Sequence, residues 1–465
     1  MFIIARHQIA SGLKDAKFLF MIVIVAIAFI FNAFSYSVRY ASDMDDWRIS
    51  LRSIDTQLEL NAGNLQQLAN APLELVKQPS PLTFISDSGD QFLPNSITGN
   101  AFIVRNLRYL SRGNKMQSAL PPIDWNFIIG SLMSLLVVLI SFGAICGEKR
   151  DGTLRLLLSN PVSRIKLFFG KYLGLTVILL FAFAVGITLN LLTILSLGAI
   201  HFDSAMLGSI GWAVLAGSLY LSFFLLVGLS VSSLTHRPAV SLVILLACWV
   251  LIVIAVPGLA RILAEQAFNV RSLSDVESEI LSVRKEMEDS APLGARRSTA
   301  RGADNMIERT NLANAVLASE IRFRNAGITE QINQANAVHT YSSISPAGIL
   351  AGTLENLSST GIAGFSAFME KTRRYKNQLN SFIDERDRTD PTSPHILNSW
   401  GHYSEYGTYS TEPVDAGTVP RWQGLWQERL PESQQSPGPQ LLFLLAAGAL
   451  MGLVAFIALA KYDPR

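Results

Sequence analysis

Six long runs of apolar residues divide the chain, and the segments between them are polar. The apolar runs occupy 18–38, 127–146, 172–197, 207–234, 240–263 and 441–460. Each is about 20 residues or longer, the length that an α-helix needs to cross the hydrocarbon core of a bilayer. The first run exceeds the apolar core of a signal peptide, so it is predicted to be a retained helix. The pattern therefore predicts an α-helical polytopic membrane protein with six transmembrane helices.

The distribution of basic residues predicts which side each polar segment occupies. Six spans place both termini on one side, together with the segment 147–171, and the short segments of that side carry many Lys and Arg residues. The short loop 198–206 on the other side has neither. Because short cytoplasmic loops are enriched in Lys and Arg, the termini are predicted to be cytoplasmic. The two large polar regions, 39–124 and 264–439, are then extracytoplasmic insertions.

Both ends of the chain are predicted to lie on the cytoplasmic side. Residues 1–17 carry Arg6, Lys14 and Lys17 among apolar residues and are predicted to form a cytoplasmic amphipathic helix. Residues 461–465 form a short cytoplasmic tail.

The two insertions differ in pattern. The first half of 39–124 has leucines at helical spacing, and its second half has prolines, glycines and short apolar runs, which predicts an α+β domain. In the second insertion, Val276, Ile280, Val283 and Met287 follow the period of a helix with one packed stripe. A break at Pro292 and a second helical stretch predict a long helical hairpin.

The end of the second insertion, 390–439, is rich in Pro, Gly, Trp and Tyr. Trp422 and Trp426 share one helical face just before the last span. Because tryptophan is enriched at membrane interfaces, we expect both side chains to anchor a helix on the outer leaflet. An aromatic platform for a sugar or a peptide is the alternative.

Composition excludes several classes of function. The chain is 49% hydrophobic and only 16% charged, with a net charge of +2, so nothing indicates nucleic-acid binding. Its two cysteines, Cys146 and Cys248, fall within spans, which leaves no disulfide framework in the polar regions. The spacing of His339, His395 and His402 fits no local metal motif, so neither a metal site nor a catalytic residue is predicted.

Polar and small residues within the spans suggest helix packing. Asn32 and Asn190 are single polar residues in apolar runs, for which hydrogen bonds between helices are expected and substrate contact is the alternative. Gly448 and Gly452 would allow close approach of another helix, by packing within the chain or by dimerisation. Gly170 and Gly174 have the same spacing at the start of the third span.

The segment 147–171 has its own pattern. Leu154, Leu157 and Leu158 fall on one face opposite Arg155, which predicts a short amphipathic helix at the membrane surface. Proline lacks the backbone donor, so Asn160-Pro161 must end this helix.

A second helix is predicted directly after the break. Ser163 can cap it, and its first turns carry Arg164, Lys166 and Lys171 before the next apolar run begins.

The string from Gly147 to Gly174 resembles the signature of ABC-2 type transporter permeases, in which a Glu precedes G-T-L-x-x-L-L-x-x-P-V-S-R and then G-K. The matching residues are Glu148, Gly152, Thr153, Leu154, Leu157, Leu158, Pro161, Val162, Ser163, Arg164, Gly170 and Lys171. The outer regions look like a branch with enlarged extracytoplasmic domains, which includes relatives of gliding-motility and nitrous-oxide-reductase maturation permeases. The chain has no G-x-x-x-x-G-K-[ST] string for binding ATP itself.

The resemblance implies a permease subunit of a bacterial inner-membrane transporter. Such subunits pair with a second permease copy or paralogue and with separate ATPase chains, which bind ATP and Mg²⁺; the chain itself would hold no cofactor and would not be an enzyme. The coupling element docking on the ATPase would comprise Glu148, Arg150, Gly152, Thr153, Leu154, Leu157, Leu158, Pro161, Ser163, Arg164 and Lys171.

Three functions remain open from the sequence. The first is export of a substrate, and spans poor in polar residues suit an amphiphilic one. The second is mechanotransmission, in which the ATPase cycle moves the outer domains against an extracytoplasmic protein partner. The third is a membrane-anchored extracytoplasmic enzyme.

Overall fold

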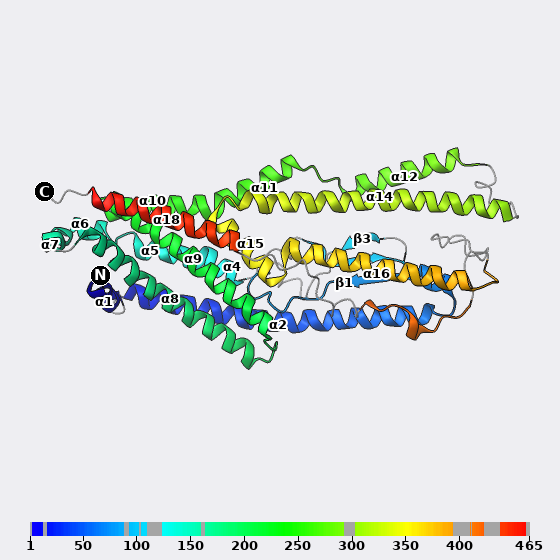
Figure 1. The fold of residues 1–465 in the computed structure, drawn as a ribbon, viewed down its shortest axis with the longest axis horizontal. Helices are drawn as coiled ribbons and strands as arrows, with labels where there is room; N and C mark the ends of the chain where they lie inside the picture. Colours follow the sequence, from blue (N-terminus) through cyan, green and yellow to red (C-terminus); the bar gives the residue numbers. More distant parts are fainter. Residues whose placement is uncertain are drawn as a thin grey trace.

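The computed structural model shows an elongated molecule with a helical bundle at one end and a polar domain at the other (Figure 1). It describes residues 2–12, 16–87, 93–101, 104–108, 123–159, 163–292, 303–393, 410, 412–422 and 438–461. Both termini lie at the end of the bundle that is remote from the polar domain, which we call the distal domain.

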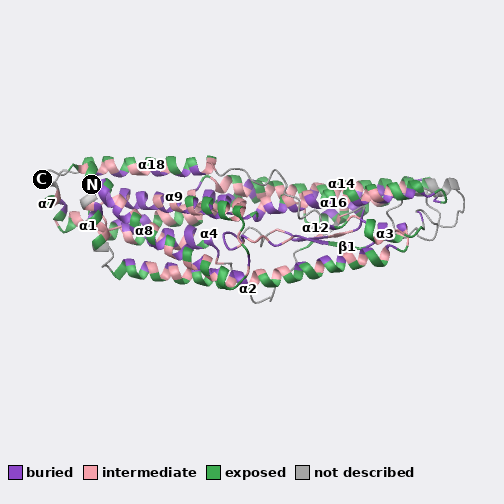
Figure 2. Cartoon of the chain, turned by 60° about the horizontal axis from the view of Figure 1, so that its bottom comes forward, coloured by how far each residue is buried: buried purple, intermediate pink, exposed green. Residues whose placement is uncertain are grey.

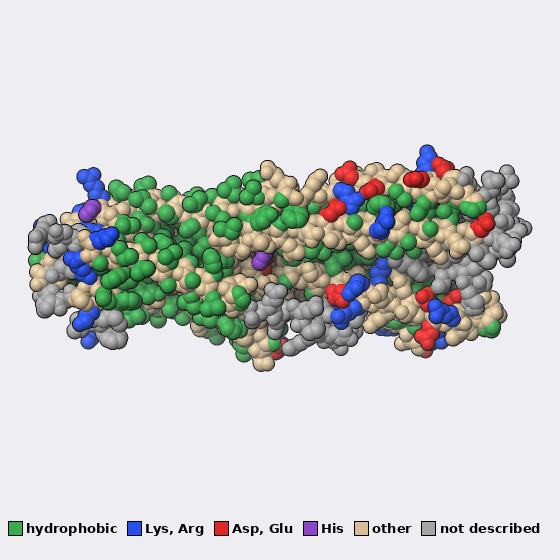
Figure 3. Space-filling view, turned by 45° about the horizontal axis from the view of Figure 1, so that its top comes forward, with side chains coloured by type: hydrophobic (Ala, Val, Ile, Leu, Met, Phe, Trp, Pro, Cys, Tyr) green, Lys and Arg blue, Asp and Glu red, His purple; other side chains and the backbone are tan. Residues whose placement is uncertain are grey.

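The bundle confirms a polytopic helical protein, because six helical segments are long and apolar enough to cross a membrane. They are α2 (Ala16–Asn61), Trp125–Arg150, α8 (Arg164–Ser196), α9 (Ser204–Leu234), Pro238–Ala267 and α18 (Gly438–Ala460). On the face shown in Figure 3, hydrophobic side chains cover the bundle, Lys and Arg gather at its free end, and charges of both signs lie on the distal domain. This is the surface that a bilayer requires of a spanning bundle.

The helix that contains the first predicted span, 18–38, continues well beyond residue 38. Helix α2 continues without a break for 46 residues, about 70 Å, from the bundle into the distal domain. Its distal half buries Leu51, Ile54 and Leu58 in the core of that domain. The helix continues because an apolar stripe at helical spacing replaces the all-apolar pattern of the span.

Two of the spans contain a wide π-helical turn. One is η2 (Ile128–Met133), between α4 (Trp125–Phe127) and α5 (Ser134–Ser141). The other is η3 (Val250–Ala255), between α10 (Pro238–Trp249) and α11 (Val256–Ala267).

Carbonyls at both wide turns find side-chain donors. Tyr220 donates from its hydroxyl to the Gly130 oxygen at 2.7 Å, and Ser345 donates to the Ile252 oxygen at 2.6 Å. Pro257 explains the second turn, because it lacks the N–H that would continue the helical hydrogen bonds.

The distal domain has one compact core around a small sheet. Strands β1 (Leu73–Val76), β2 (Ser96–Gly99) and β3 (Val104–Arg108) pair antiparallel in that order. Helices α3 (Leu65–Asn70) and α16 (Gly361–Thr389) and the distal half of α2 pack around them. Figure 2 shows two buried interiors, a large one in the bundle and a smaller one here.

The predicted helical hairpin is present beside this core. It consists of α12 (Leu273–Ser290) and α14 (Ala303–Ser342), and the stripe that begins at Val276 and Ile280 is buried between them. Arg271 joins Glu279 at 2.6 Å and Glu330 at 2.8 Å, which ties the base of α12 to α14.

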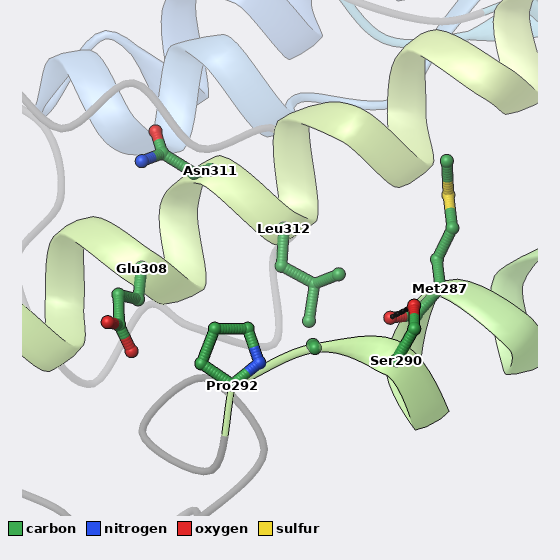
Figure 4. A pocket seen from close by; sticks show the side chains of 7 residues that line it. Met287, Ser290, Pro292, Glu308, Asn311 and Leu312 are labelled. Atoms are coloured by element: carbon green, nitrogen blue, oxygen red, sulfur yellow. Dashed lines mark hydrogen bonds between the residues drawn. The ribbon is translucent and has the colours of Figure 1, made fainter.

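A small pocket of about 340 Å³ lies at the far end of the hairpin. Figure 4 shows Met287, Ser290 and Pro292 facing Glu308 and Leu312 across it.

A further helix, α15 (Pro346–Ser358), enters the side of the bundle. It buries Leu350 and Leu354 in the bundle core and packs against α9 and both wide turns. This helix was not predicted, because its apolar run is too short to be a span.

Trp422 is not the membrane-interface anchor that was predicted. Its ring is 1% exposed and packs edge-on against Phe368 and Tyr375, and its Nε1 donates to the Val76 oxygen at 3.4 Å. The segment 412–422 crosses the distal domain, where Arg421 joins Asp55 of α2 at 3.2 Å. Trp426 lies outside the described residues. The burial of Trp422 in the core also excludes its use as an exposed aromatic platform.

Candidate functional site

The predicted coupling segment forms an elbow at the free end of the bundle, made of α6 (Cys146–Arg150) and α7 (Thr153–Ser159). The turn between them places Gly152 at φ +73°, in the left-handed region that glycine adopts without strain. Nothing lies within 4 Å of the position where a Cβ of Gly152 would stand, so the backbone conformation alone demands glycine there. The bond from Arg150 to Asp151, at 2.8 Å, lowers the pKa of that carboxyl.

Glu148 and Lys171 are paired with each other inside the elbow. The Lys171 ammonium lies 2.6 Å from Glu148 Oε1, and the side chains are 5% and 30% exposed. Lys171 also donates to the Ala144 oxygen at 2.7 Å. Both residues were predicted to contact a partner, but the structure places Lys171 in the interior, where it fixes α6 to the start of α8.

Lys149 holds the elbow to a third helix. Its ammonium donates to the backbone oxygens of Ser233 and Thr235, at the C-terminal end of α9, the latter at 3.3 Å. Carbonyls at the C-terminal end of a helix have no N–H partner within that helix, so the Lys149 ammonium supplies their hydrogen bonds. Its positive charge also interacts favourably with the negative end of the helix dipole. The Ser232 hydroxyl accepts from the backbone N–H groups of Ile145 and Cys146, both at 3.0 Å.

Lys149 and the serines of α9 were not among the predicted site residues. A cation beside a span end and a serine pair near the end of another are common features, and only the fold brings them together.

Helix α7 has one buried side and one exposed side, as its pattern predicted. Leu154 is fully buried in the bundle core and Leu157 is partly buried against it. On the other side, Leu156 is 69% exposed and Arg155 and Thr153 are also exposed. The predicted leucine face therefore attaches α7 to neighbouring spans, and its opposite face is available to another molecule. The side chain of Leu158 and the whole of Pro161 lie outside the described part of the chain.

The start of α8 agrees with the predicted cap. The Ser163 hydroxyl accepts from the Lys166 N–H at 3.3 Å, as an N-cap residue does. Arg164 donates to the backbone oxygen of Ala460, the last residue of α18. The elbow region thus reaches the ends of α8, α9 and α18.

The N-terminal helix α1 (Phe2–Gly12) lies against α8 near the elbow. A Cβ on Gly174 would stand 2.7 Å from the Gln8 Cβ and 3.2 Å from the Ala5 oxygen, so glycine is what permits this close approach. Gly174 therefore packs within the chain.

Gly448 and Gly452 likewise pack within the chain. A Cβ at either position would meet Leu226 of α9, at 3.6 and 3.5 Å. Ser230 of α9 also donates to the Met451 oxygen at 2.7 Å. The predicted helix packing is thus between α18 and α9.

The two polar residues of the spans form one buried network at the distal end of the bundle. Asn190 donates to Asn32 Oδ1 at 2.7 Å and accepts from Trp125 Nε1 at 3.2 Å. Asn32 donates to the backbone oxygens of Ile123 at 2.6 Å and Phe84 at 3.3 Å. The expected hydrogen bonding between helices is confirmed, and it extends from α2 and α8 to the chain that enters the distal domain.

No group of three or more His, Cys, Asp or Glu side chains among the described residues could hold a metal ion. His339 packs against Gly352 at the base of α14, and its burial lowers the pKa of its imidazole. His395 and His402 lie outside the described residues.

The family model described as ABC-2 family transporter protein matches residues 2–360. The chain belongs to the ABC-2 family of transporter proteins. It is therefore a membrane-spanning transporter subunit, and its elbow occupies the segment through which the sequence resembles such permeases.

Two relatives are similar over a shorter stretch. One is a probable ABC transporter permease protein NosY of Pseudomonas aeruginosa, 40% identical over 80 residues, which are 17% of this chain and 29% of that protein. The NosY protein of Stutzerimonas stutzeri is 37% identical over 82 residues, which are 18% of this chain and 28% of that protein. The chain thus matches less than a third of the length of each relative.

Proposed function

We propose that this ABC-2 family chain is a permease subunit driven by a separate ATPase, which binds the exposed face of the α6–α7 elbow. The observation that carries the proposal is the attachment of the elbow to α8, to α9 and to the core of the bundle. Glu148 pairs with Lys171 of α8, Lys149 bonds the end of α9, and Leu154 is buried among the spans. A push on α7 would therefore move these helices together with it.

The chemistry of the exposed face suits a protein partner. Leu156 offers an exposed apolar contact, and Arg155, Arg150 and Asp151 give the same elbow exposed charges of both signs. Protein interfaces commonly combine apolar contacts with charges that set the register. In this proposal the elbow faces the cytoplasm of a bacterial inner membrane, ATP and Mg²⁺ reside in the ATPase, and the distal domain is extracytoplasmic.

The proposed transport mechanism is alternation between two packings of the spans. Closure of two ATPase subunits would displace two elbows, one in each of two permease copies, and rotate the attached helices. The exported substrate would be amphiphilic, because apolar side chains dominate the spans and the polar Asn32 and Asn190 are occupied by each other.

Mechanotransmission is the second candidate, and the length of α2 favours it. One unbroken helix of 46 residues joins the bundle to the core of the distal domain, so a tilt of its membrane half would be carried outward. An extracytoplasmic protein partner would then receive the motion, and no substrate would cross.

The test of ATPase coupling compares matched variants, each reconstituted with an ABC ATPase that assembles with the wild-type chain. Leu156→Asp and Arg155→Ala should weaken ATPase assembly at least tenfold, since both change the exposed face of α7. Arg237→Ala is the control, because Arg237 is an exposed cation of another loop near the end of α9. Assembly and ATPase stimulation that stay at the wild-type level in both α7 variants would contradict the proposal.

Transport in sealed vesicles separates the two candidates. ATP-dependent movement of an amphiphile supports export. Its absence, together with an ATP-dependent change in the protease sensitivity of the distal domain, supports mechanotransmission.

A further inference from the structure

A half-open pocket of about 650 Å³ lies in the distal domain, between α2 and one face of the sheet. It is far from the elbow and shares no residue with it. Its volume falls in the range of small-molecule sites, which is about 300 to 1,000 Å³.

One wall of the pocket is a face of α2. Ser50, Ser53 and Gln57 line it and recur at i, i+3 and i+7, the spacing that places side chains on one side of a helix. Their hydroxyl and amide groups can both donate and accept hydrogen bonds.

The opposite wall is a face of the sheet. Glu74 and Thr98 are directly opposite in the β1–β2 register, and Arg108 is opposite Ser96 in the β2–β3 register. Since side chains alternate along a strand, Glu74, Thr98 and Arg108 share one face, and all three line the pocket. The amides of Asn70 and Asn100 complete the polar lining.

The charges lie at opposite ends of this face. Two strand spacings and two residues separate Glu74 from Arg108, which gives about 12 Å between their Cα atoms. Arg108 makes no hydrogen bond or ion pair through its guanidinium in the described part of the structure. Glu74 accepts one bond, from the Ser96 hydroxyl at 3.1 Å, and a carboxylate can accept several more.

We propose that this pocket binds a short zwitterionic peptide in an extended conformation. Its carboxylate would pair with Arg108 and its amino group with Glu74, at a separation of about 10 Å for three extended residues. The Ser, Gln and Asn side chains along the walls would bond its peptide groups. An apolar ligand fits poorly, because the apolar part of the lining is limited to Ile49, Ile54, Pro72 and Leu73.

Triglycine is the probe, because it carries both terminal charges and no side chain. Binding is measured by calorimetry to the full chain in lipid nanodiscs, with N-acetyl-triglycine and triglycinamide as ligands that each lack one terminal charge. Triglycine should bind saturably, and each blocked form should bind at least tenfold more weakly.

Two variants assign the charges. Arg108→Gln should remove the preference for triglycine over triglycinamide, and Glu74→Gln should remove the preference over N-acetyl-triglycine. This exchange of preferences would not arise from general unfolding. Arg48→Gln is the control, because Arg48 pairs with Asp45 outside the pocket and should leave binding unchanged.

Three outcomes would overturn the proposal. One is the absence of saturable triglycine binding up to about 10 mM, ten times a weak Kd of about 1 mM. Another is equal binding of all three ligands. The third is binding that depends on Arg108 and the carboxylate alone, which would identify a simple anion site. The wild-type chain decides the first two outcomes even if a variant fails to fold.

Discussion

Lys171 on α8 and Glu148 on α6 form an ion pair of 2.6 Å that joins the elbow to the span following it. The lysine side chain is 5% exposed, so removal of Glu148 would leave a positive charge in a place where water barely reaches it. A second oxygen of Glu148 is buried and has no hydrogen bond to the residues that the structure describes. Few other groups nearby could therefore replace either partner of the ion pair.

We expect Glu148→Gln to destabilise the protein by about 3 kcal/mol, because it leaves the buried Lys171 ammonium without its counter-charge. Lys171→Met should cost less, since the carboxylate that it leaves unpaired is 30% exposed. The double variant should regain part of the loss, and thermal unfolding of all four proteins in detergent measures the coupling between the two positions. Strictly additive losses would mean that the pair contributes nothing as a pair.

The cost of substituting Gly152 should depend on the backbone conformation alone. Gly152→Ala is expected to cost about 1 to 2 kcal/mol, because φ is +73° and an alanine Cβ is strained there. Gly152→Asn should cost less, since asparagine enters this region more readily. Gly147→Ala is the control: it lies within α6 with open space around it and should be neutral or stabilising. The apparent Tm of each variant gives the ranking, and equal losses at both glycines would contradict it.

The buried amides should matter for the connection between bundle and distal domain. Asn190→Leu removes the partner of Asn32 and of the Trp125 indole, and we expect a loss of about 1 to 3 kcal/mol from the polar groups left without bonds. Hydrogen exchange should increase at the start of α4, where Trp125 lies. Thr188→Val provides the comparison, because its hydroxyl bonds only its own helix, at 2.8 Å, and faces outward. An unchanged exchange pattern in Asn190→Leu would show that the network is dispensable.

Burial lowers the pKa of Lys376 on α16 to about 8, from an ordinary value near 10.5. The folded state therefore releases this proton more readily than the unfolded state, and the burial penalty diminishes as the pH rises from about 8 to 10.5. We expect the stability contributed by this group to rise across that window. Lys376→Met should remove the rise, which denaturant unfolding at pH 7.5 and pH 10 measures. A wild-type protein that gains no stability relative to Lys376→Met between these pH values would contradict the assignment.

Local pattern was enough to predict the spans and the elbow. Hydropathy over about 20 residues finds a membrane helix because the bilayer imposes that length. Proline, glycine and a capping serine mark the ends of short helices through their own backbone chemistry, and so Ser163 was predicted correctly as a cap. The apolar stripe from Val276 to Met287 likewise predicted a helix of the hairpin, because its period is a property of neighbouring residues.

Only the tertiary structure decided which surfaces these elements bury. The sequence suggested a membrane interface for Trp422, but an indole with one bonded N–H suits a protein core equally well, and Phe368 and Tyr375 supply that core. Lys171 and Glu148 could face a partner or each other, and the packing of α6 on α8 selects the pair. The sequence by itself thus determined where helices form and how they are interrupted, because those depend on neighbouring residues. Packing decided the rest, because contacts between distant residues depend on the whole fold.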